Sequence, residues 1–177
     1  YEVLLTGGPG TGYGIAQEAA RKSDNIYGTG TSGAYVLTPI AASTNEWKGT
    51  SNSTWSTGNN WNSGAKPTST QVAVFNTLGT GRATATLDGN NTIAGIQFGN
   101  QTSTSYTING AYTLTLSGTV PYIQQQSSKN QTVSPTGLAL SANTVVDITG
   151  AGNLTIGANI TGSAKNLIKD GTGAGKL

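Results

Sequence analysis

The residues of this chain that could do chemistry are a glycine-rich segment, seven carboxylates and three tryptophans. The glycine-rich segment, residues 7–14, has the sequence GGPGTGYG and follows a strand-like stretch, a context in which backbone amides can hold a phosphate. A phosphate loop needs Lys followed by Ser or Thr after Gly12, but Tyr13 and Gly14 stand there. We therefore predict a flexible N-terminal arm and expect no cofactor.

The carboxylates could serve a glycosidase, which needs two of them facing each other about 5–10 Å apart. Asp88 and Asp147 are the pair that could meet in a folded structure, although Asp88 lies in a turn-like Leu-Asp-Gly context. His and Cys are both absent, which removes the usual general base, the usual metal ligands and any disulfide. No closely spaced acids suggest a Ca²⁺ loop. We expect no enzyme activity and no metal site; a polysaccharide-degrading enzyme is the least favoured alternative.

Trp47, Trp55 and Trp61 are the only tryptophans of the chain, and small polar residues separate them. Indole faces bind sugars and cations well, so the three could form a carbohydrate platform. They could equally cover one end of a stack of β-strands, since the end of such a stack must be shielded. We predict the second arrangement, a structural cap, and keep glycan binding as the alternative.

Composition narrows the function classes further. Charged residues make up only 9% of the 177 residues, and the formal net charge is +2. The basic residues are scattered, whereas a nucleic-acid surface needs Lys and Arg clustered on one face. No apolar run approaches the roughly 20 residues of a membrane helix. We therefore expect neither nucleic-acid binding nor membrane insertion of this segment.

Short β-strands separated by Gly and Asn turns are expected through most of the chain. Tyr112, Leu114 and Leu116 alternate with threonines, which predicts a strand with one face turned toward a core. Asn109-Gly110 is a hairpin signal between two such segments. The expected strands cover residues 71–75, 83–87, 93–98, 106–108, 112–116, 120–123, 131–133, 138–140, 145–148, 154–156 and 167–169.

Such short strands favour an all-β solenoid of stacked parallel strands. A solenoid coil needs only a few inward side chains per strand, because the next coil completes the core. Recurrent Asn residues can also stack in ladders from coil to coil. We expect an irregular N-terminal arm (1–43) with short strands at 3–5 and 35–40 and a candidate helix at 15–25. A solenoid domain (44–177) follows, with a Trp-rich cap (44–82) and coils (83–177).

Four motifs follow one another along residues 44–177. Spaced tryptophans with the pair Asn60-Trp61, Pro67 and the segment AVF (73–75) come first. They are followed by TLDGNNTIAGIQFG (86–99), by YTI and LTL (106–108 and 114–116), and by LIKDGTGAGKL (167–177). In order and spacing these resemble the autotransporter-associated β-strand repeat, or passenger-associated transport repeat, of bacterial surface proteins. Residues 1–43 lie outside the resemblance.

The resemblance implies a right-handed parallel β-helix on the bacterial cell surface or outside the cell, serving as a non-enzymatic stalk, spacer or filament subunit. The alternative is an adhesin or carbohydrate-binding module that uses the tryptophans on a surface glycan. Self-association is the expected partnership, head to tail, since a solenoid end presents unpaired backbone groups. The strand-like residues that could join a neighbouring copy are Val3, Leu4, Leu5, Tyr35, Val36 and Leu37.

Overall fold

The computed structural model describes residues 26–30, 33–37, 42–76, 81–100 and 104–177. The chain divides into two compact units, Tyr1–Ala41 and Ala42–Leu177. In the first unit, β1 (Ile26–Gly30) and β2 (Gly33–Leu37) pair as an antiparallel ladder. The candidate helix at 15–25 and the strand at 3–5 lie outside the described residues.

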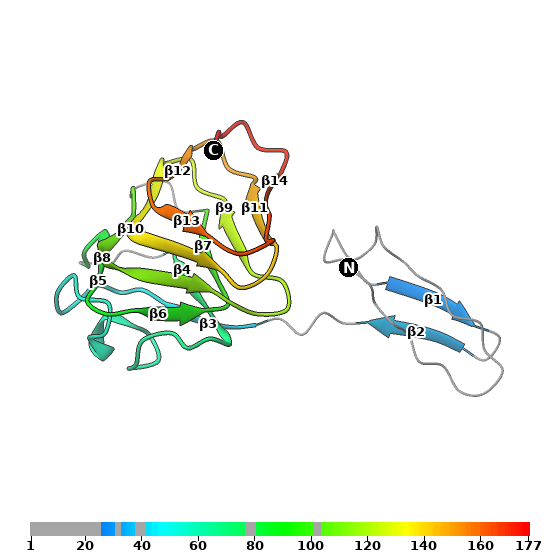
Figure 1. Cartoon of the computed structure of the whole chain (residues 1–177), viewed down its shortest axis with the longest axis horizontal. Coiled ribbons are helices and arrows are strands. Elements are labelled where there is room, and N and C mark those ends of the chain that lie inside the picture. The colour runs from blue at the N-terminus through cyan, green and yellow to red at the C-terminus, as the bar shows by residue number, and fades with distance from the viewer. Residues whose placement is uncertain (1–25, 31–32, 38–41, 77–80, 101–103) are drawn as a thin grey trace. The chain divides into compact units, whose positions relative to one another are not determined.

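The second unit is a stack of parallel strands, so the expected all-β solenoid is confirmed, with about four turns (Figure 1). One six-stranded sheet has the order β14-β11-β9-β7-β4-β3; in the other, β12-β10-β8-β5 are joined by β6 and β13. Within the described residues no helix is long and apolar enough to cross a membrane. The strands are β3 (Ser43–Glu46), β4 (Gln71–Phe75), β5 (Thr84–Leu87), β6 (Asn91–Ile93), β7 (Gly95–Phe98), β8 (Thr107–Leu116), β9 (Tyr122–Gln125), β10 (Gln131–Leu140), β11 (Thr144–Ile148), β12 (Leu154–Ile156), β13 (Asn159–Thr161) and β14 (Leu167–Asp170).

Each complete coil has three sides, because the long strands β8 and β10 each cover two of them. β5 pairs with the first part of β8 and β6 with its last part, while β12 and β13 divide β10 in the same way. The hairpin predicted at Asn109-Gly110 is therefore wrong, since both residues lie inside β8. Gly110 has φ +124°, and a Cβ there would lie 2.4 Å from the Leu87 carbonyl oxygen. The glycine lets the strand continue past the coil beneath it instead of reversing.

Asparagine side chains link successive coils at a regular spacing. The backbone N–H groups of Asn153, Asn166 and Lys176 donate to the Oδ1 atoms of Asn130, Asn143 and Asn153, with 2.9, 3.0 and 2.9 Å between the heavy atoms. In each pair the two residues are 23 positions apart, which is one coil. These bonds form the expected asparagine ladder, and they fix the register at coil corners where strand pairing stops.

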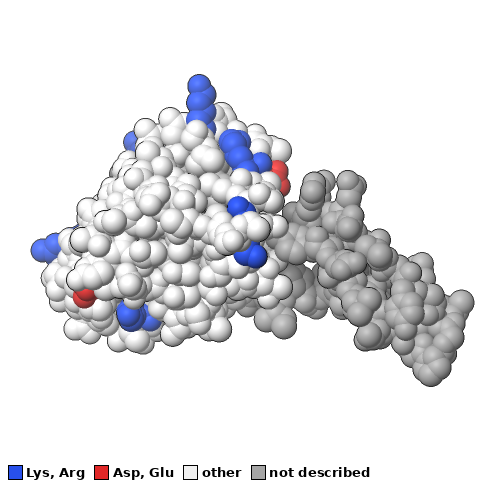
Figure 2. All heavy atoms as spheres, viewed as in Figure 1, with Lys and Arg blue, Asp and Glu red and all other residues white. Residues whose placement is uncertain are grey.

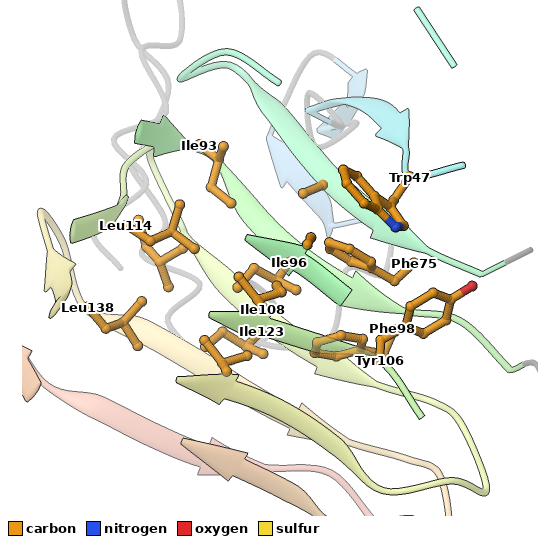
Figure 3. Packing of buried hydrophobic residues seen from close by; sticks show 14 of the residues in the cluster. Trp47, Phe75, Ile93, Ile96, Phe98, Tyr106, Ile108, Leu114, Ile123 and Leu138 are labelled. Carbon is orange, nitrogen blue, oxygen red and sulfur yellow. The ribbon is translucent and has the colours of Figure 1, made fainter. Parts of the chain in front are cut away.

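The core consists of inward side chains that lie above one another in columns. Ala73, Ile96, Ile123 and Val146 are successive partners in β4, β7, β9 and β11, and all four are fully buried. Figure 3 shows these layers meeting side chains from the opposite sheet, with the aromatic residues at one end. Each strand contributes only a few inward apolar side chains. Parallel pairing in register stacks them into a core that no single coil could enclose.

Candidate functional site

The three tryptophans meet in one cluster at the N-terminal end of the stack. All three are fully buried. The ring centroid of Trp61 lies 5.0 Å from that of Trp47 and 4.7 Å from that of Trp55, both edge to face. Trp47 Nε1 donates to the Arg82 carbonyl (2.7 Å), and Trp61 Nε1 donates to the Trp55 carbonyl (2.7 Å). No indole face of this cluster is exposed to stack on a sugar.

Asn60 holds together the chain segment that encloses the tryptophans, and the sequence did not single it out for this role. It is fully buried and is the last residue of the short 3₁₀ helix Gly58–Asn60. Its Oδ1 accepts the backbone amides of Ser51 (2.9 Å) and Asn52 (3.2 Å). Its Nδ2 donates to Asn52 Oδ1 (2.8 Å) and to the Thr54 carbonyl (2.9 Å). One side-chain amide therefore ties residues 51–54 to Asn60, within the segment between Trp47 and Trp61.

Aromatic packing continues from the cap into the coils. Phe75 lies 5.5 Å from Phe98 and 5.4 Å from Tyr106, centroid to centroid. The Tyr106 ring is fully buried, and its hydroxyl has no hydrogen-bond partner in the described part of the chain. Burial, with a smaller contribution from the negative charge of Glu46, raises the pKa of Tyr106 to about 12. The phenol is therefore fixed in its neutral form and serves packing.

The structure does not bring Asp88 and Asp147 together. Asp88 follows β5 at an exposed corner, where its carboxylate accepts hydrogen bonds from the Ser56 amide (3.1 Å) and hydroxyl. Burial alone would raise the pKa of Asp88, but these bonds and the charge of Lys66 outweigh it and lower the pKa. Asp147 lies in β11, in the other sheet, and accepts a bond from Gln124 Nε2 (2.9 Å). In the described structure Asp147 is aligned with Asp170 of β14, so these two carboxylates stand side by side on one sheet rather than across a cleft, and Asp88 belongs to the other sheet.

The proposed assembly residues are only partly described. Val3, Leu4 and Leu5 lie outside the described residues. Tyr35, Val36 and Leu37 belong to β2, where their backbones are aligned with Gly28, Tyr27 and Ile26 of β1. β2 is therefore already paired with β1. To join a neighbouring copy, it would have to give up this pairing or use its other edge.

The C-terminal end of the solenoid is built differently from the Trp-capped end. Its last strands, β12, β13 and β14, each have one strand partner within the described structure, and the N–H of Leu154 in β12 also donates to the Lys176 carbonyl (2.8 Å). Between them lies a hollow of about 310 Å³. Ile160, Ile168 and Leu177 remain between 42% and 49% exposed. The hollow is lined by Leu154, Thr155, Ile156, Ile160, Leu167 and Leu177.

No group of three or more Asp and Glu side chains that could hold a metal occurs among the described residues. Charged side chains are few on a largely uncharged surface, as Figure 2 shows for one face. Comparison with protein-family models, with curated proteins and with solved structures finds no match to this chain. The most distinctive group of side chains among the described residues is thus the buried indole cluster at the N-terminal end of the stack.

Proposed function

We propose that this chain is a non-enzymatic structural unit of an extracellular or bacterial cell-surface protein, in which the solenoid sets a distance. The observation that supports this role most strongly is the continuous coil stack. The apolar columns run in register through β4, β7, β9 and β11 and are buried throughout. Every coil added in this register lengthens the stack by one strand spacing, about 4.8 Å, without changing its cross-section.

The extracellular part of the proposal rests on the resemblance to the autotransporter-associated β-strand repeat. The surface chemistry is compatible with it: the outward columns of the coils are rich in Thr, Ser, Asn and Gln, as in the aligned residues Thr84, Thr107, Thr132 and Thr155. Such residues suit a sheet whose backbone groups are already paired with neighbouring coils.

The role as a filament subunit is the second form of this proposal. In favour of it, β3 and β14 are the two end strands of the same sheet, so one copy could extend another. Continuing the sheet in the same register would, however, place Asp170 beside Glu46 of the next copy, because both belong to one outward column. This would add a third carboxylate to a column that already holds Asp147 beside Asp170, which weakens the contact. The spacer role rests on the continuous coil stack alone and is the form tested below.

The alternative of a glycan-binding module needs an accessible aromatic face. Because Trp47, Trp55 and Trp61 are fully buried, binding through them would require the cap to open. A glycan array tests this directly. Saturable binding that is lost in Trp55→Ala while the circular dichroism spectrum is retained would support the module and count against a purely structural role.

The spacer role is tested by inserting one additional coil. A second copy of residues 131–153, placed after Asn153, adds one 23-residue period in register. We expect a cooperative fold whose long dimension, measured by small-angle X-ray scattering, grows by about 4.8 Å. The matched control inserts only residues 131–152, which shifts the following strands by one residue and turns their apolar faces outward. Equal stability of the two insertions, or cleavage of a polysaccharide by the native chain, would refute the proposal.

A further inference from the structure

The outer edge of β3 is closed by a later part of the same chain. Within the described structure β3 has one strand partner, β4, and Trp47, directly after β3, donates its N–H to a carbonyl of β4 (2.8 Å). Backbone groups of successive strand residues point to opposite edges, so Glu46 and Lys48 turn theirs to the outer edge. There the Glu46 carbonyl accepts the N–H of Asn62 (2.8 Å), and the Lys48 N–H donates to the Asn60 carbonyl (2.7 Å).

Asn45 extends this closure over the core. It is aligned with Ala73 of β4, in the inward column that continues with Ile96, and its side chain is only 2% exposed. Its Oδ1 accepts the N–H of Ser63 (3.2 Å), and its Nδ2 donates to the Ala65 carbonyl (2.8 Å). An amide therefore ends the apolar column at β3, and both of its bonding groups hold the chain that crosses it.

The first strand of the other sheet, β5, is closed by the same part of the chain. The N–H of Trp55 donates to the Thr86 carbonyl (2.8 Å), and the N–H of Thr86 donates to the Ser53 carbonyl (2.7 Å). Residues 53–65, here called the covering segment, thus lie on the outer edges of both β3 and β5. The segment is parallel to β5 but antiparallel to the chain at the end of β3. It therefore breaks the parallel order of the stack, and no strand can pair with β3 without displacing it.

We propose that the covering segment is an autoinhibitory contact: it bars strand pairing while closed, and when it opens, β3 pairs with β3 of a second copy. The two strands would meet edge to edge and antiparallel about a two-fold axis, so that one contact satisfies both edges. With Asn45 on the axis, Thr44 lies opposite Glu46, which is the only charged residue of the strand, so no two carboxylates face each other. The inference rests on the edge contacts and goes beyond the proposed spacer role, because it makes association conditional on opening.

The test opens the covering segment in the full chain and measures association by size-exclusion chromatography with light scattering. Asn45→Ala combined with Asn60→Ala removes the side-chain bonds that hold the segment to β3 and to itself. We expect this double variant to associate at a concentration at least about tenfold below that needed by the native chain. Leu138→Ala, a fully buried change in β10 that leaves the segment intact, is the control for destabilisation and should behave like the native chain.

A proline at Thr44 identifies the strand that pairs. Thr44 is exposed and, two residues before Glu46, turns its N–H to the same outer edge. Thr44→Pro removes this donor and should abolish the association of the double variant, whereas Thr44→Val keeps the donor and should not.

Three results would overturn the inference. They are a double variant that retains its β circular dichroism yet associates no more readily than the native chain, association that persists with Thr44→Pro, and equal association of Leu138→Ala. If the double variant loses its β signal, Asn45→Ala alone retains the Asn60 bonds, and the same three results decide. The coil insertion leaves residues 43–65 unchanged, so the spacer proposal stands or falls on its own test.

Discussion

Asn60 provides the sharpest test of how the solenoid is closed at its Trp-capped end. Asn60→Ala removes hydrogen bonds to Ser51, Asn52 and Thr54, four in total, inside a fully buried site. Each such bond contributes about 0.5–1.5 kcal/mol net, and unsatisfied partners add to the loss. We expect the free energy of unfolding to fall by about 3 kcal/mol, allowing some partners to recover water. Asn59→Ala, the exposed neighbour, should change it by less than about 0.5 kcal/mol.

The assay is urea unfolding followed by two signals. Tryptophan fluorescence reports only the cap, because Trp47, Trp55 and Trp61 are the only tryptophans, and far-ultraviolet circular dichroism reports all coils. With a denaturant slope of about 1–3 kcal/mol per molar, a loss of 3 kcal/mol lowers the midpoint by about 1–3 M. Coincident transitions would show that the cap and the coils unfold together.

Asn60→Asp separates loss of the amide donor from loss of volume. The retained oxygen can still accept from Ser51 and Asn52, but the second oxygen would face two acceptors, Asn52 Oδ1 and the Thr54 carbonyl. The buried carboxyl should therefore have a raised pKa. This variant is least destabilised below the unfolded-state value of about 3.9 and loses stability as the pH rises through its folded-state pKa. An unchanged midpoint in both variants, or an equal effect of Asn59→Ala, would refute the assigned role of Asn60.

Three further predictions concern the coils. Leu114→Ala should lower the free energy of unfolding by about 2–5 kcal/mol, because the side chain is fully buried. Tyr112 is 43% exposed on the same strand, so Tyr112→Ala should cost less than about 1 kcal/mol. Comparable losses in urea melts would contradict the assigned faces. Gly110→Ala combines φ +124° with a clash against backbone and should lower the melting temperature, while Gly89→Ala, with nothing within 4 Å of the new Cβ, should have little effect. The raised pKa of Tyr106 makes stability complete below about pH 10, the unfolded-state value, and lost progressively as the pH rises toward about 12. Tyr106→Phe should remove this part of the alkaline loss, and an identical pH profile of the two proteins would show that other groups cause it.

Local sequence patterns were enough to identify most of the solenoid strands and the fold class. Runs such as residues 145–148 and 154–156 alternate apolar and polar side chains with a period of two, which is a property of an extended chain alone. Their brevity pointed to a stack in which neighbouring coils complete the core. Where a strand has little alternation the prediction failed: β1, β3 and β13 were missed, and only the last residue of β6 was included in an expected strand. Burial in β13 is low throughout.

The path of the chain at corners depended on the coils above and below. Asn109-Gly110 has the composition of a hairpin turn, but β5 and β10 pair with β8 on its two sides and hold it extended past the glycine. The same pairing fused the separately predicted segments 131–133 and 138–140 into β10, with a register shift between Pro135 and Gly137. Strand continuity is a non-local property, because partners about one coil apart in sequence decide it.

The sequence alone determined that the tryptophans belong to one segment, that His and Cys chemistry is absent, and that the coils repeat. Only the tertiary structure decided that the indoles are buried, and that Asn60 rather than Asn59 is buried with them. It alone placed Lys169 at the end of an apolar column, since the columns arise from alignment across β4, β7, β9, β11 and β14. Burial and register come from contacts between distant coils, and no local pattern of residue types contains them.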